Sequence, residues 1–345
     1  YTSGLMAASI KDYNYSLPEK LIASNPRPNR EQAKLMIFNK SSEFVKHTIF
    51  SEMPNYLTKG DVIVLNDTKV IPGRLFLKKE TGGIVELLFH KIINKNTAIC
   101  IFSSSRKLSL DSKLYIDKNN YLEVVSIYKN YVTLSSNQDI LSLFINHGEV
   151  PLPKYIKRKA TRNDVDRYQT TYAKNNGSVA APTAGLHFTK EILNKIKKKG
   201  VLIEYLTLHV TYNTFKPIQC DDYTKHDIGS EYCSISKKLM TTIESTKRNK
   251  KNIIAVGTTA TRALENYATK SLKGSFSGEA DLYITPGYKF KIINGMITNF
   301  HLPQSTLLLL VSALAGKENI LNLYNKAIDN NYRFYSYGDS MFIKT

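Results

Sequence analysis

The sequence predicts an α/β fold in which a main α/β domain carries an inserted antiparallel β-barrel domain. Beyond residue 150, apolar strand-like runs alternate with helix-like segments, which is typical of a sheet covered by helices. From 73 to 150, short β-rich runs recur instead, separated by Gly, Asn, Ser and Lys turns, as in small antiparallel barrels. We therefore expect 1–72 and 151–345 to form the main domain and 73–150 to form the barrel.

The main domain begins with two strand-like runs. KLMIFN covers 34–39, and GDVIVLNDTKVIP covers 60–72. After the insertion, Thr189 is a good N-cap for a helix that ends before Gly200. The other expected elements, in chain order, are strands at 201–210 and 252–257, a helix at 258–268, extended pieces around a Pro286–Gly287 turn, helices at 304–316 and 318–331, and a closing strand at 332–343.

The expected barrel consists of five strand-like runs. They alternate apolar and polar residues and are short enough for a small closed or sandwiched sheet. The proline-containing segment GEVPLPKYI ends the insertion. The runs lie at 84–90, 97–103, 113–118, 121–128 and 131–136.

The charge balance is strongly basic. The 345-residue chain has 48 Lys and Arg against 29 Asp and Glu, a formal charge of +19. Such an excess suits a polyanionic partner, because each neutralised phosphate releases counterions. The alternative is compositional bias, since Lys and Asn are abundant throughout. A cluster interleaved with Tyr155 favours nucleic-acid contact, and its basic members are Lys154, Lys157, Arg158 and Arg162.

Cellular context is constrained by what the sequence lacks. No apolar run approaches the roughly 20 residues that cross a bilayer, and no signal-peptide pattern is present. The three cysteines suggest no disulfide framework and fit a reducing compartment. Cys220, His226 and Cys233 match no common zinc spacing, so unrelated thiols are the favoured interpretation. We expect a cytoplasmic protein without a membrane or metal partner, and nothing demands more than a monomer.

Common catalytic signatures are missing as well. The sequence has no GxxxxGK[ST] phosphate loop and no GxGxxG turn opening a helix, so neither an NTPase nor a standard dinucleotide fold is supported. GxSxG and HExxH motifs are also absent.

Polar residues instead gather at the predicted ends of strands and helices. His187 follows a loop of small residues, SVAAPTAG, and precedes a helix. Gly257, Thr258 and Thr259 turn from a strand into a helix whose free N–H groups could hold an anion or a ribose hydroxyl. In open α/β sheets, ligands collect beyond the carboxyl ends of strands. The other residues so placed are Asp67, His209, Arg262, Glu265, Asn299, His301, Arg333 and Asp339.

Each of these residues also has a purely structural explanation. A lone loop histidine is commonly a surface or hydrogen-bonded residue. Arg262 and Glu265, three positions apart, could form a helix-face ion pair. Asp339 after Gly338 is an ordinary turn residue. Their common placement favours a ligand site but names no reaction.

Several long motifs resemble the S-adenosylmethionine:tRNA ribosyltransferase-isomerase family. In the C-terminal half these are SVAAPTAGLHFT, VGTTATRALE, PGYKF, TNFHLPQSTLLLLVSALAG and YRFYSYGDSMFI. In the N-terminal half YSLPEKLIASNPRPNR, VIVLNDTKVIPGRL, TGGIVELL, GEVPLPKYIKR and DRYQTTYA match in the same order. The resemblance covers nearly the whole chain, and it implies an α/β domain with an inserted β-barrel, in agreement with the division made from the residues.

The resemblance also implies a reaction. The family transfers and isomerises the ribosyl part of S-adenosylmethionine onto 7-aminomethyl-7-deazaguanine at the wobble position of tRNAs with GUN-type anticodons. The products are epoxyqueuosine-tRNA, adenine and methionine, as a step of queuosine biosynthesis. S-adenosylmethionine is then a co-substrate, no prosthetic group or metal is required, and tRNA is the polyanionic partner.

Two positions depart from the family pattern. The family usually has glycine where this chain has Asn213, and a second histidine where it has Gly229. Asn tolerates a left-handed backbone well, so the first change is conservative in conformation. The second counts against an essential proton transfer at 229.

The implied reaction needs acid–base groups, and histidines with a pKa near the working pH suit them. The hypothesis assigns this work to His187, His209 and His301, with Asp67, Glu265 and Asp339 as orienting carboxylates. Arg262 or Arg333 would hold the methionine carboxylate. The other expected substrate-binding residues are Thr183, Gly185, Gly257, Thr258, Thr259 and Asn299.

Two other functions stay open at this point. A catalytically inactive tRNA-binding paralogue is supported only by the departures at 213 and 229. An ordinary methyltransferase is disfavoured by the missing glycine-rich cofactor loop.

Overall fold

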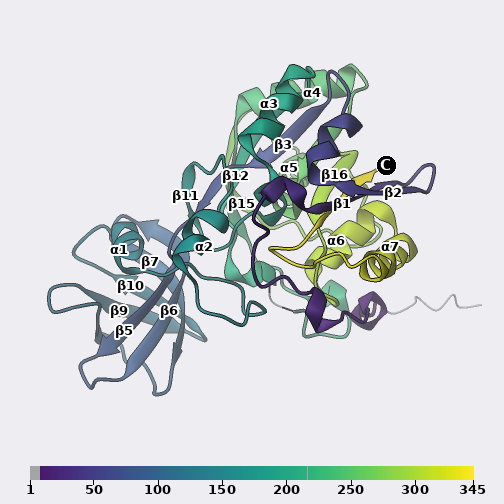
Figure 1. Ribbon diagram of the computed structural model, residues 1–345. Helices are drawn as coiled ribbons and strands as arrows, with labels where there is room; N and C mark the ends of the chain where they lie inside the picture. Colours follow the sequence, from purple (N-terminus) through teal and green to yellow (C-terminus); the bar gives the residue numbers. More distant parts are fainter. Residues whose placement is uncertain (1–7, 216) are drawn as a thin grey trace, which may run out of the picture.

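The structure is a computed structural model and describes residues 8–215 and 217–345. Figure 1 shows two lobes, a larger one built on a mixed sheet and a smaller one formed by a β-barrel. This confirms the predicted fold class of an α/β domain with an antiparallel barrel.

The larger lobe contains a nine-stranded sheet of order β15-β13-β12-β3-β14-β16-β17-β1-β2. β12, β3, β14 and β16 run parallel, so their carboxyl ends lie on one edge of the sheet. The bounds are β1 (Lys34–Asn39), β2 (Phe44–Ile49), β3 (Val62–Asn66), β12 (Leu202–Leu208), β13 (Glu231–Ile235), β14 (Ile253–Val256), β15 (Phe276–Ala280), β16 (Gly295–Asn299) and β17 (Ser340–Lys344).

Helices cover both faces of this sheet, as its all-buried central strand β3 requires. Val62 and Val64 face the cluster that includes residues of α4, α5, α6 and α7, whereas Ile63 and Leu65 face the cluster of α3 and the 3₁₀ helix η4. The helices are η4 (Phe50–Tyr56), α3 (Lys190–Lys198), α4 (Lys237–Arg248), α5 (Thr258–Thr269), α6 (Thr306–Ala315) and α7 (Lys317–Asp329). Thr189 caps α3 as predicted, accepting a hydrogen bond from the Ile192 N–H at 3.2 Å.

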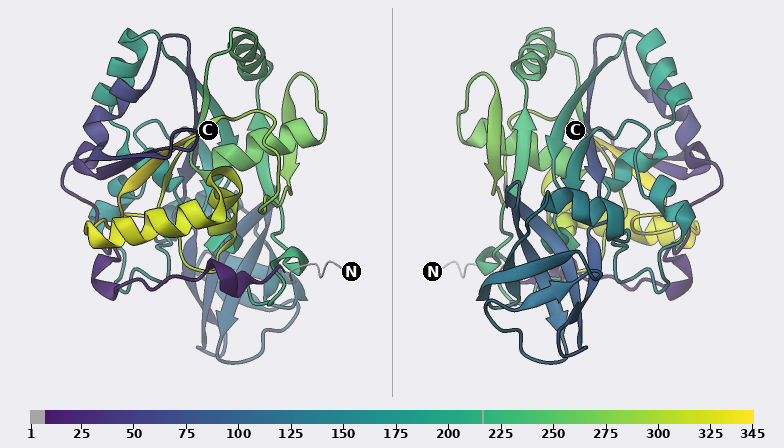
Figure 2. Two further views of the ribbon diagram at one scale, coloured as in Figure 1. Left: turned by 90° about the vertical axis from the view of Figure 1, so that its right-hand side faces the viewer. Right: turned by 90° about the vertical axis from the view of Figure 1, so that its left-hand side faces the viewer.

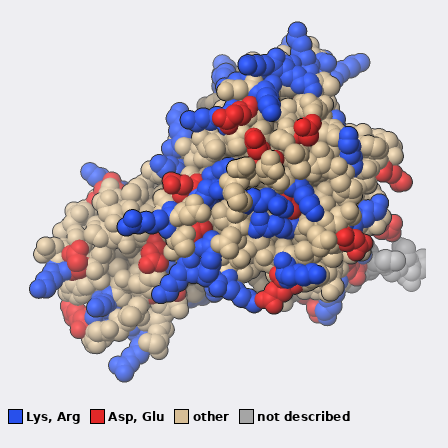
Figure 3. Space-filling model, viewed as in Figure 1, with Lys and Arg blue, Asp and Glu red and all other residues tan. Residues whose placement is uncertain are grey.

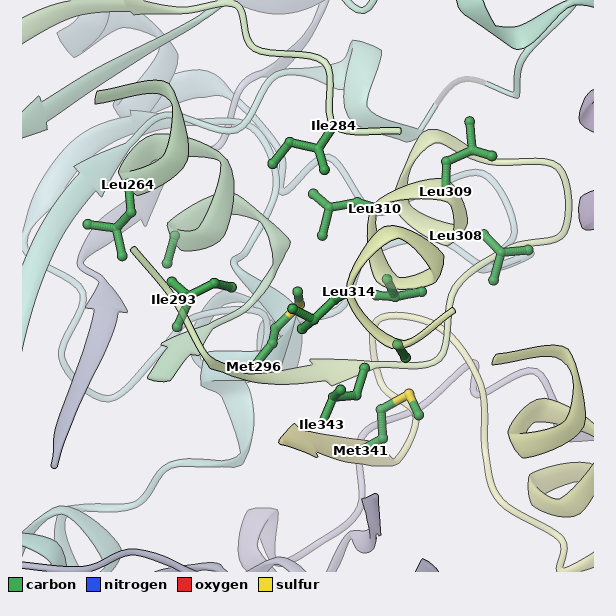
Figure 4. Packing of buried hydrophobic residues seen from close by; sticks show 14 of the residues in the cluster. Leu264, Ile284, Ile293, Met296, Leu308, Leu309, Leu310, Leu314, Met341 and Ile343 are labelled. Atoms are coloured by element: carbon green, nitrogen blue, oxygen red, sulfur yellow. The ribbon is translucent and has the colours of Figure 1, made fainter. Parts of the chain in front are cut away.

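The apolar segment at 304–316 forms the buried helix α6. Figure 4 shows Leu314 of α6 near Met296 of β16 and Ile343 of β17. Among the described residues no single helix is long and apolar enough to cross a membrane; α6 and α7 pass that test only as a pair bent by 111°.

The smaller lobe is a closed barrel of order β10-β7-β6-β5-β8-β9, followed by helix α1 (Ile140–His147), which contributes to its core. The strands are β5 (Arg74–Lys79), β6 (Ile84–Asn94), β7 (Thr97–Ser104), β8 (Lys113–Tyr115), β9 (Tyr121–Tyr128) and β10 (Tyr131–Ser135). The first and last of them lie within the predicted insertion. The domain boundaries at 73 and 150 themselves stay a prediction.

Between the lobes, β4 (Thr68–Val70) pairs in parallel with β11 (Asn175–Ser178). The short helix α2 (Arg162–Arg167) lies near this pair, as Figure 1 shows. The 3₁₀ helices η3 (Arg30–Gln32) and η5 (Thr183–His187) complete the surroundings of the candidate site.

Described residues near the start of the chain pack against the C-terminal helix α7. Figure 2 shows the N-terminal segment running beside the C-terminal helices on the larger lobe. Lys317 of α7 pairs with Asp12 at 3.2 Å, and the ring of Tyr15 lies edge-on to Tyr324 at 5.2 Å. The expected closing strand at 332–343 begins only at Ser340, since Tyr335 and Gly338 belong to a tight turn in which Tyr335 has φ of 73°.

Gly148 offers a test of the join between the lobes. A Cβ atom there would lie 1.8 Å from the Pro72 carbonyl oxygen and 2.6 Å from that of Phe144. We expect Gly148→Ala to lower the free energy of unfolding by about 3 kcal/mol or more, because backbone cannot yield as a flexible side chain does. Urea denaturation measures this change.

Gly83→Ala is the matched control. Its Cβ would meet only the Lys79 Cδ atom, at an ordinary 3.7 Å, so the expected change is below about 0.5 kcal/mol. Equal stabilities of the two variants would contradict the close approach at Gly148.

Candidate functional site

Most of the polar residues predicted to form a site lie along one edge of the sheet, beyond β3, β12, β14 and β16, whereas Glu265 binds the segment before β16. The structure nevertheless distributes the three candidate histidines among three separate cavities. His187 lines one, His209 lines a second, and His301 lines a third.

His187 ends η5 and is buried against the ring of Phe50, 5.0 Å away between centroids. Its Nε2 lies 2.9 Å from the Oδ1 of Asn299. The Asn299 amide donates to the carbonyls of Tyr335 and Ser336, which fixes its orientation. Nε2 of His187 therefore carries a proton, and Nδ1 is the atom that can accept one. Burial lowers the pKa of His187 and favours the neutral imidazole, whereas the Asn299 hydrogen bond, the Asp339 charge and the Arg30 backbone oppose this.

Three arginines share the cavity of His187. Arg27, Arg30 and Arg167 line it together with His187, and we call it the arginine pocket. Its floor includes Gly338 of the turn before β17. These arginines were not predicted as site residues. The sequence signals were the pair of basic residues in the proline-containing segment NPRPNR, and Arg167 in the motif DRYQTTYA.

Asp339 lies next to this pocket and is fully buried. Its carboxylate accepts two hydrogen bonds from the Arg27 guanidinium at 3.1 Å, one from the Lys34 N–H at 2.8 Å and one from the Arg333 N–H at 2.7 Å. The Arg333 side chain donates to the Asn25 carbonyl. Burial, and then the charge of Arg27, lower the pKa of Arg333. The structure thus brings Asp339, Arg333, Asn299 and His187 together.

His301 lies in a cavity with the strand-to-helix turn at the start of α5. Thr183, Gly257, Thr258 and Thr259 line the same cavity, so four of the eight predicted substrate-binding residues are brought together here. Gly257 has φ of 90°, a conformation that favours glycine. The Nε2 of His301 lies 2.8 Å from the Thr298 hydroxyl, and burial lowers the pKa of His301 to about 3. A neutral imidazole with so low a pKa is a weak base, which disfavours His301 as a proton acceptor.

Arg262 does not pair with Glu265, the helix neighbour that spacing suggested. Its guanidinium lies 2.9 Å from Glu231 and also donates to the Gly229 carbonyl at 2.7 Å. Both side chains of the pair are buried, so the charge of Arg262 is already neutralised. Arg262 is thereby disfavoured as the residue that holds a substrate carboxylate.

Glu265 holds a loop instead of facing a histidine. Its buried carboxylate accepts hydrogen bonds from Tyr288 Oη and from three consecutive N–H groups, at 2.8 to 3.0 Å. The three backbone donors are Lys291, Ile292 and Ile293. These contacts fasten the segment before β16 to α5. These contacts do not support a role for Glu265 as an orienting carboxylate.

His209 lies between the two lobes. Its Nδ1 is 2.8 Å from the Thr68 hydroxyl, and its ring stacks on Tyr232 with centroids 5.5 Å apart and planes at 22°. Burial lowers the pKa of His209, while the charge of Asp67 raises it. Asp67 itself accepts hydrogen bonds from Thr207 at 2.6 Å and Asn175 at 3.1 Å.

The cavity beside His209 has a volume of about 280 Å³ and is lined by both lobes. Lys91 of the barrel and Glu279 of the main sheet form an ion pair across it, at 2.5 Å. Gly177 is needed here, because a Cβ atom would lie 2.7 Å from the Nε2 of His209. This cavity combines an aromatic stack with a carboxylate at its wall.

Part of the small-residue loop before His187 is explained by protein packing. A Cβ atom on Gly185 would lie 2.2 Å from the Tyr172 hydroxyl oxygen and 2.9 Å from a methyl carbon of Thr170. Glycine is therefore needed at 185, because neighbouring side chains fill the space that a Cβ atom would occupy. Gly185 itself does not line the cavity. Ala181, Pro182 and Ala184 do line the His301 cavity.

The predicted tRNA-binding residues differ in whether a carboxylate already binds their side chains. Figure 3 shows Lys and Arg side chains gathered near α2, between the two lobes. The Arg158 guanidinium donates to the buried carboxylate of Asp164 at 2.6 and 2.8 Å. Lys157 forms an ion pair with Glu19 at 2.5 Å, and both of these side chains are exposed. Lys154 lies over the ring of Tyr212, and Arg162 begins α2 at the surface.

The remaining sequence expectations concern metals and the two family departures. Within 8–215 and 217–345, no group of three His, Cys, Asp or Glu side chains could hold a metal ion. Gly229 has φ of 67°, and its carbonyl is the one bound by Arg262. The side chain of Asn213 lies outside what the structure describes.

The low pKa of His301 predicts an acid-sensitive fold. The folded state protonates this imidazole only near pH 3, whereas the unfolded chain does so near pH 6.5. The unfolded state binds more protons between these values, so stability falls as the pH drops through this window. Between pH 7.5 and pH 5, His301 should account for a loss of about 2 kcal/mol in the free energy of unfolding.

Comparison with His301→Gln isolates this contribution from the other histidines. The variant should lose about 2 kcal/mol less than the wild type between the two pH values, as measured by urea denaturation at each pH. An identical loss in both proteins would show that His301 titrates normally in the folded state.

Comparisons with known proteins agree with one another. A family model described as queuosine biosynthesis protein matches residues 10–343. An S-adenosylmethionine:tRNA ribosyltransferase-isomerase of Sulfurihydrogenibium sp. (strain YO3AOP1) is 47% identical over 97% of this chain and 99% of its own length. One of the same name from Legionella pneumophila (strain Lens) is 43% identical over 96% and 98%.

A solved structure is also similar to this chain. The crystal structure of S-adenosylmethionine tRNA ribosyltransferase from Thermotoga maritima is 30% identical, with a TM-score of 0.57 over 96% of this chain and 99% of that one. The resemblance found in the sequence motifs is thereby confirmed. The chain belongs to the queuosine biosynthesis protein family, together with these ribosyltransferase-isomerases.

Proposed function

We propose that this chain is a ribosyltransferase-isomerase that transfers and isomerises the ribosyl moiety of S-adenosylmethionine onto 7-aminomethyl-7-deazaguanine at the tRNA wobble position. The products would be epoxyqueuosine-tRNA, adenine and methionine. The observation that carries this proposal is the match to named relatives at 43 to 47% identity over nearly the full length of both chains. The net charge of +19 supports tRNA as the macromolecular substrate.

The reaction has three requirements. A base removes the proton from the carbon beside the sulfonium, adenine is protonated as it leaves, and the aminomethyl nitrogen attacks as a neutral amine. A neutral histidine serves the first of these needs, provided that one ring nitrogen is free to accept a proton.

His187 and His209 meet this requirement better than His301. His187 is neutral because of burial, and its bond to Asn299 leaves Nδ1 as the accepting atom. His209 also has a lowered pKa and faces a cavity of about 280 Å³. We therefore assign the acid–base work to these two histidines.

The His209 cavity suits the wobble base. Enzymes that modify a base take it out of its stack and hold it on aromatic side chains. Tyr232, already stacked on His209 and 40% exposed, offers such a surface. Glu279 at the cavity wall could accept hydrogen bonds from the aminomethyl group, beside its bonds to Lys91 and Ser230.

Product analysis tests the reaction. With S-adenosylmethionine and tRNA carrying 7-aminomethyl-7-deazaguanine, the purified protein should release adenine and methionine in amounts equal to the modified tRNA formed. Chromatography with mass detection measures all three. Release of S-adenosylhomocysteine would identify a methyltransferase, and tRNA binding without adenine release would identify an inactive binding protein.

Single-turnover rates test the assigned histidines. His187→Ala should slow adenine release by about 100-fold to 10,000-fold, the usual contribution of a general acid or base, whereas His301→Gln should slow it less than tenfold. His147→Ala, an exposed histidine on α1, is the control and should leave the rate unchanged. Wild-type rates in both His187→Ala and His209→Ala would remove histidine catalysis from the proposal.

The stacking surface has its own test. Tyr232→Ala should raise the KM for the tRNA substrate by about tenfold, because a base–aromatic stack is worth about 1–3 kcal/mol. Tyr232→Phe retains the ring and should behave like the wild type. Equal behaviour of the two variants would exclude stacking at this position.

A further inference from the structure

The arginine pocket holds more positive charge than its carboxylates neutralise. Arg27 is paired with Asp339, but no ion pair among residues 8–215 and 217–345 includes Arg30, Arg167 or Arg333. Asp166 attracts Arg30 only weakly, since its charge has the smallest effect on the pKa of Arg30. Asp164 is already bound by Arg158. A surplus of guanidinium groups therefore surrounds a partly enclosed space.

Backbone carbonyls hold these guanidinium groups in place without neutralising them. Arg30 donates to the carbonyls of Leu186 at 3.0 Å and Asp166 at 2.9 Å. Arg167 donates to the carbonyls of Pro28 at 3.1 Å and Arg27 at 2.5 Å. Each guanidinium has five N–H donors, so both retain donors beyond these contacts. The side chains are thus fixed in position while still able to bind a ligand.

Arg167 provides an independent observation. Its Nε atom is buried, and it has no hydrogen-bond partner among the described residues. Buried polar atoms are nearly always paired, so an unpartnered guanidinium N–H beside a cavity indicates a missing acceptor.

The pKa of Arg30 agrees with this picture. Burial, and then the charge of Arg167, lower the pKa of Arg30 below its usual range. Two guanidinium groups that repel each other are stabilised when an anion lies between them.

We propose that the arginine pocket binds a substrate oxyanion, held by the guanidinium groups of Arg30 and Arg167 at the wall that His187 completes. The geometry of a planar guanidinium suits a carboxylate or a phosphate, to which it can donate in pairs. The source of this oxyanion follows from the proposed function and rests on it. The oxyanion is either the methionine carboxylate of S-adenosylmethionine or a phosphate of the tRNA backbone. Arg262, neutralised by Glu231, does not compete for it.

The first experiment tests the pocket without relying on catalysis. Sulfate, a tetrahedral oxyanion, should raise the melting temperature of the wild-type protein, compared with chloride at equal ionic strength. The increase should be smaller in Arg30→Gln and Arg167→Gln, which retain only the general stabilisation that sulfate gives by its exclusion from protein surfaces. The full increase should persist in Arg106→Gln, an exposed arginine of the barrel. Equal sulfate stabilisation in all four proteins would overturn the proposal, even if the protein proves to be a ribosyltransferase.

The second experiment identifies the source of the oxyanion. A rise of about tenfold to 100-fold in the KM for S-adenosylmethionine, with an unchanged KM for tRNA, would assign the carboxylate. The converse would assign a tRNA phosphate. Unchanged values for both in Arg30→Gln and Arg167→Gln would contradict a substrate site.

Arg30→Lys tests whether a loss of folding, rather than a loss of oxyanion binding, explains a raised KM in Arg30→Gln. It retains the charge but not the paired donors, so its KM should lie between those of the wild type and Arg30→Gln. A KM equal to that of Arg30→Gln would show that the paired geometry is essential. A wild-type KM would show that charge alone suffices for oxyanion binding.

Discussion

The buried carboxylate of Asp339 is the interaction on which the candidate site depends. It joins the N-terminal segment, through Arg27 and the Lys34 N–H, to the turn before the last strand, through the Arg333 N–H. β1 and β17 then continue side by side in parallel register, with Met36 opposite Met341. Removing one partner from a buried ion pair costs about 3–5 kcal/mol, because the remaining charge stays buried. The two ends of the chain therefore meet at a defined place, and the arginine pocket forms there.

Four arginines of this protein show two arrangements that serve different purposes. Arg158 and Arg262 each meet a buried carboxylate, Asp164 of α2 and Glu231 of β13. Arg30 and Arg167 instead meet only carbonyl oxygens. A guanidinium paired with a carboxylate stabilises the fold, whereas one anchored by carbonyls keeps its charge for a ligand. Counting basic residues in the sequence cannot separate the two groups, since the partner is supplied by tertiary contacts.

The fold class could be predicted because it depends on local patterns. Apolar runs and turn residues recur at fixed spacings, and the barrel and the sheet follow from them. The closing strand was predicted too long, since the aromatic residues from Tyr332 to Tyr337 suggest a strand, whereas Gly338 closes a local turn in which its N–H donates to the Tyr335 carbonyl. The partner of Arg262 was missed because it is distant in sequence. Neighbours at helical spacing are visible in a sequence, but Glu231, on another element, is not.

The strand-end placement of several candidate residues could be predicted, but the arrangement of their side chains could not. Polar residues after β3, β12, β14 and β16 do share an edge of the sheet, as parallel strands require. Position at a strand end does not determine the direction of a side chain, however. His187, His209 and His301 consequently enter three cavities. The arginine pocket was missed because Arg27 and Arg30, in a proline-containing segment, look like ordinary surface residues.

His187 connects the arginine pocket to the chemistry. Burial has the largest effect on the pKa of His187 and lowers it; the Arg30 backbone raises that pKa, and the charge of Arg30 has the smallest effect and lowers it. An oxyanion between Arg30 and Arg167 would offset that charge and raise the pKa of the imidazole. By linkage, protonation of His187 would strengthen oxyanion binding by the same free energy. An oxyanion anchored in this pocket would thus favour the protonated form of His187.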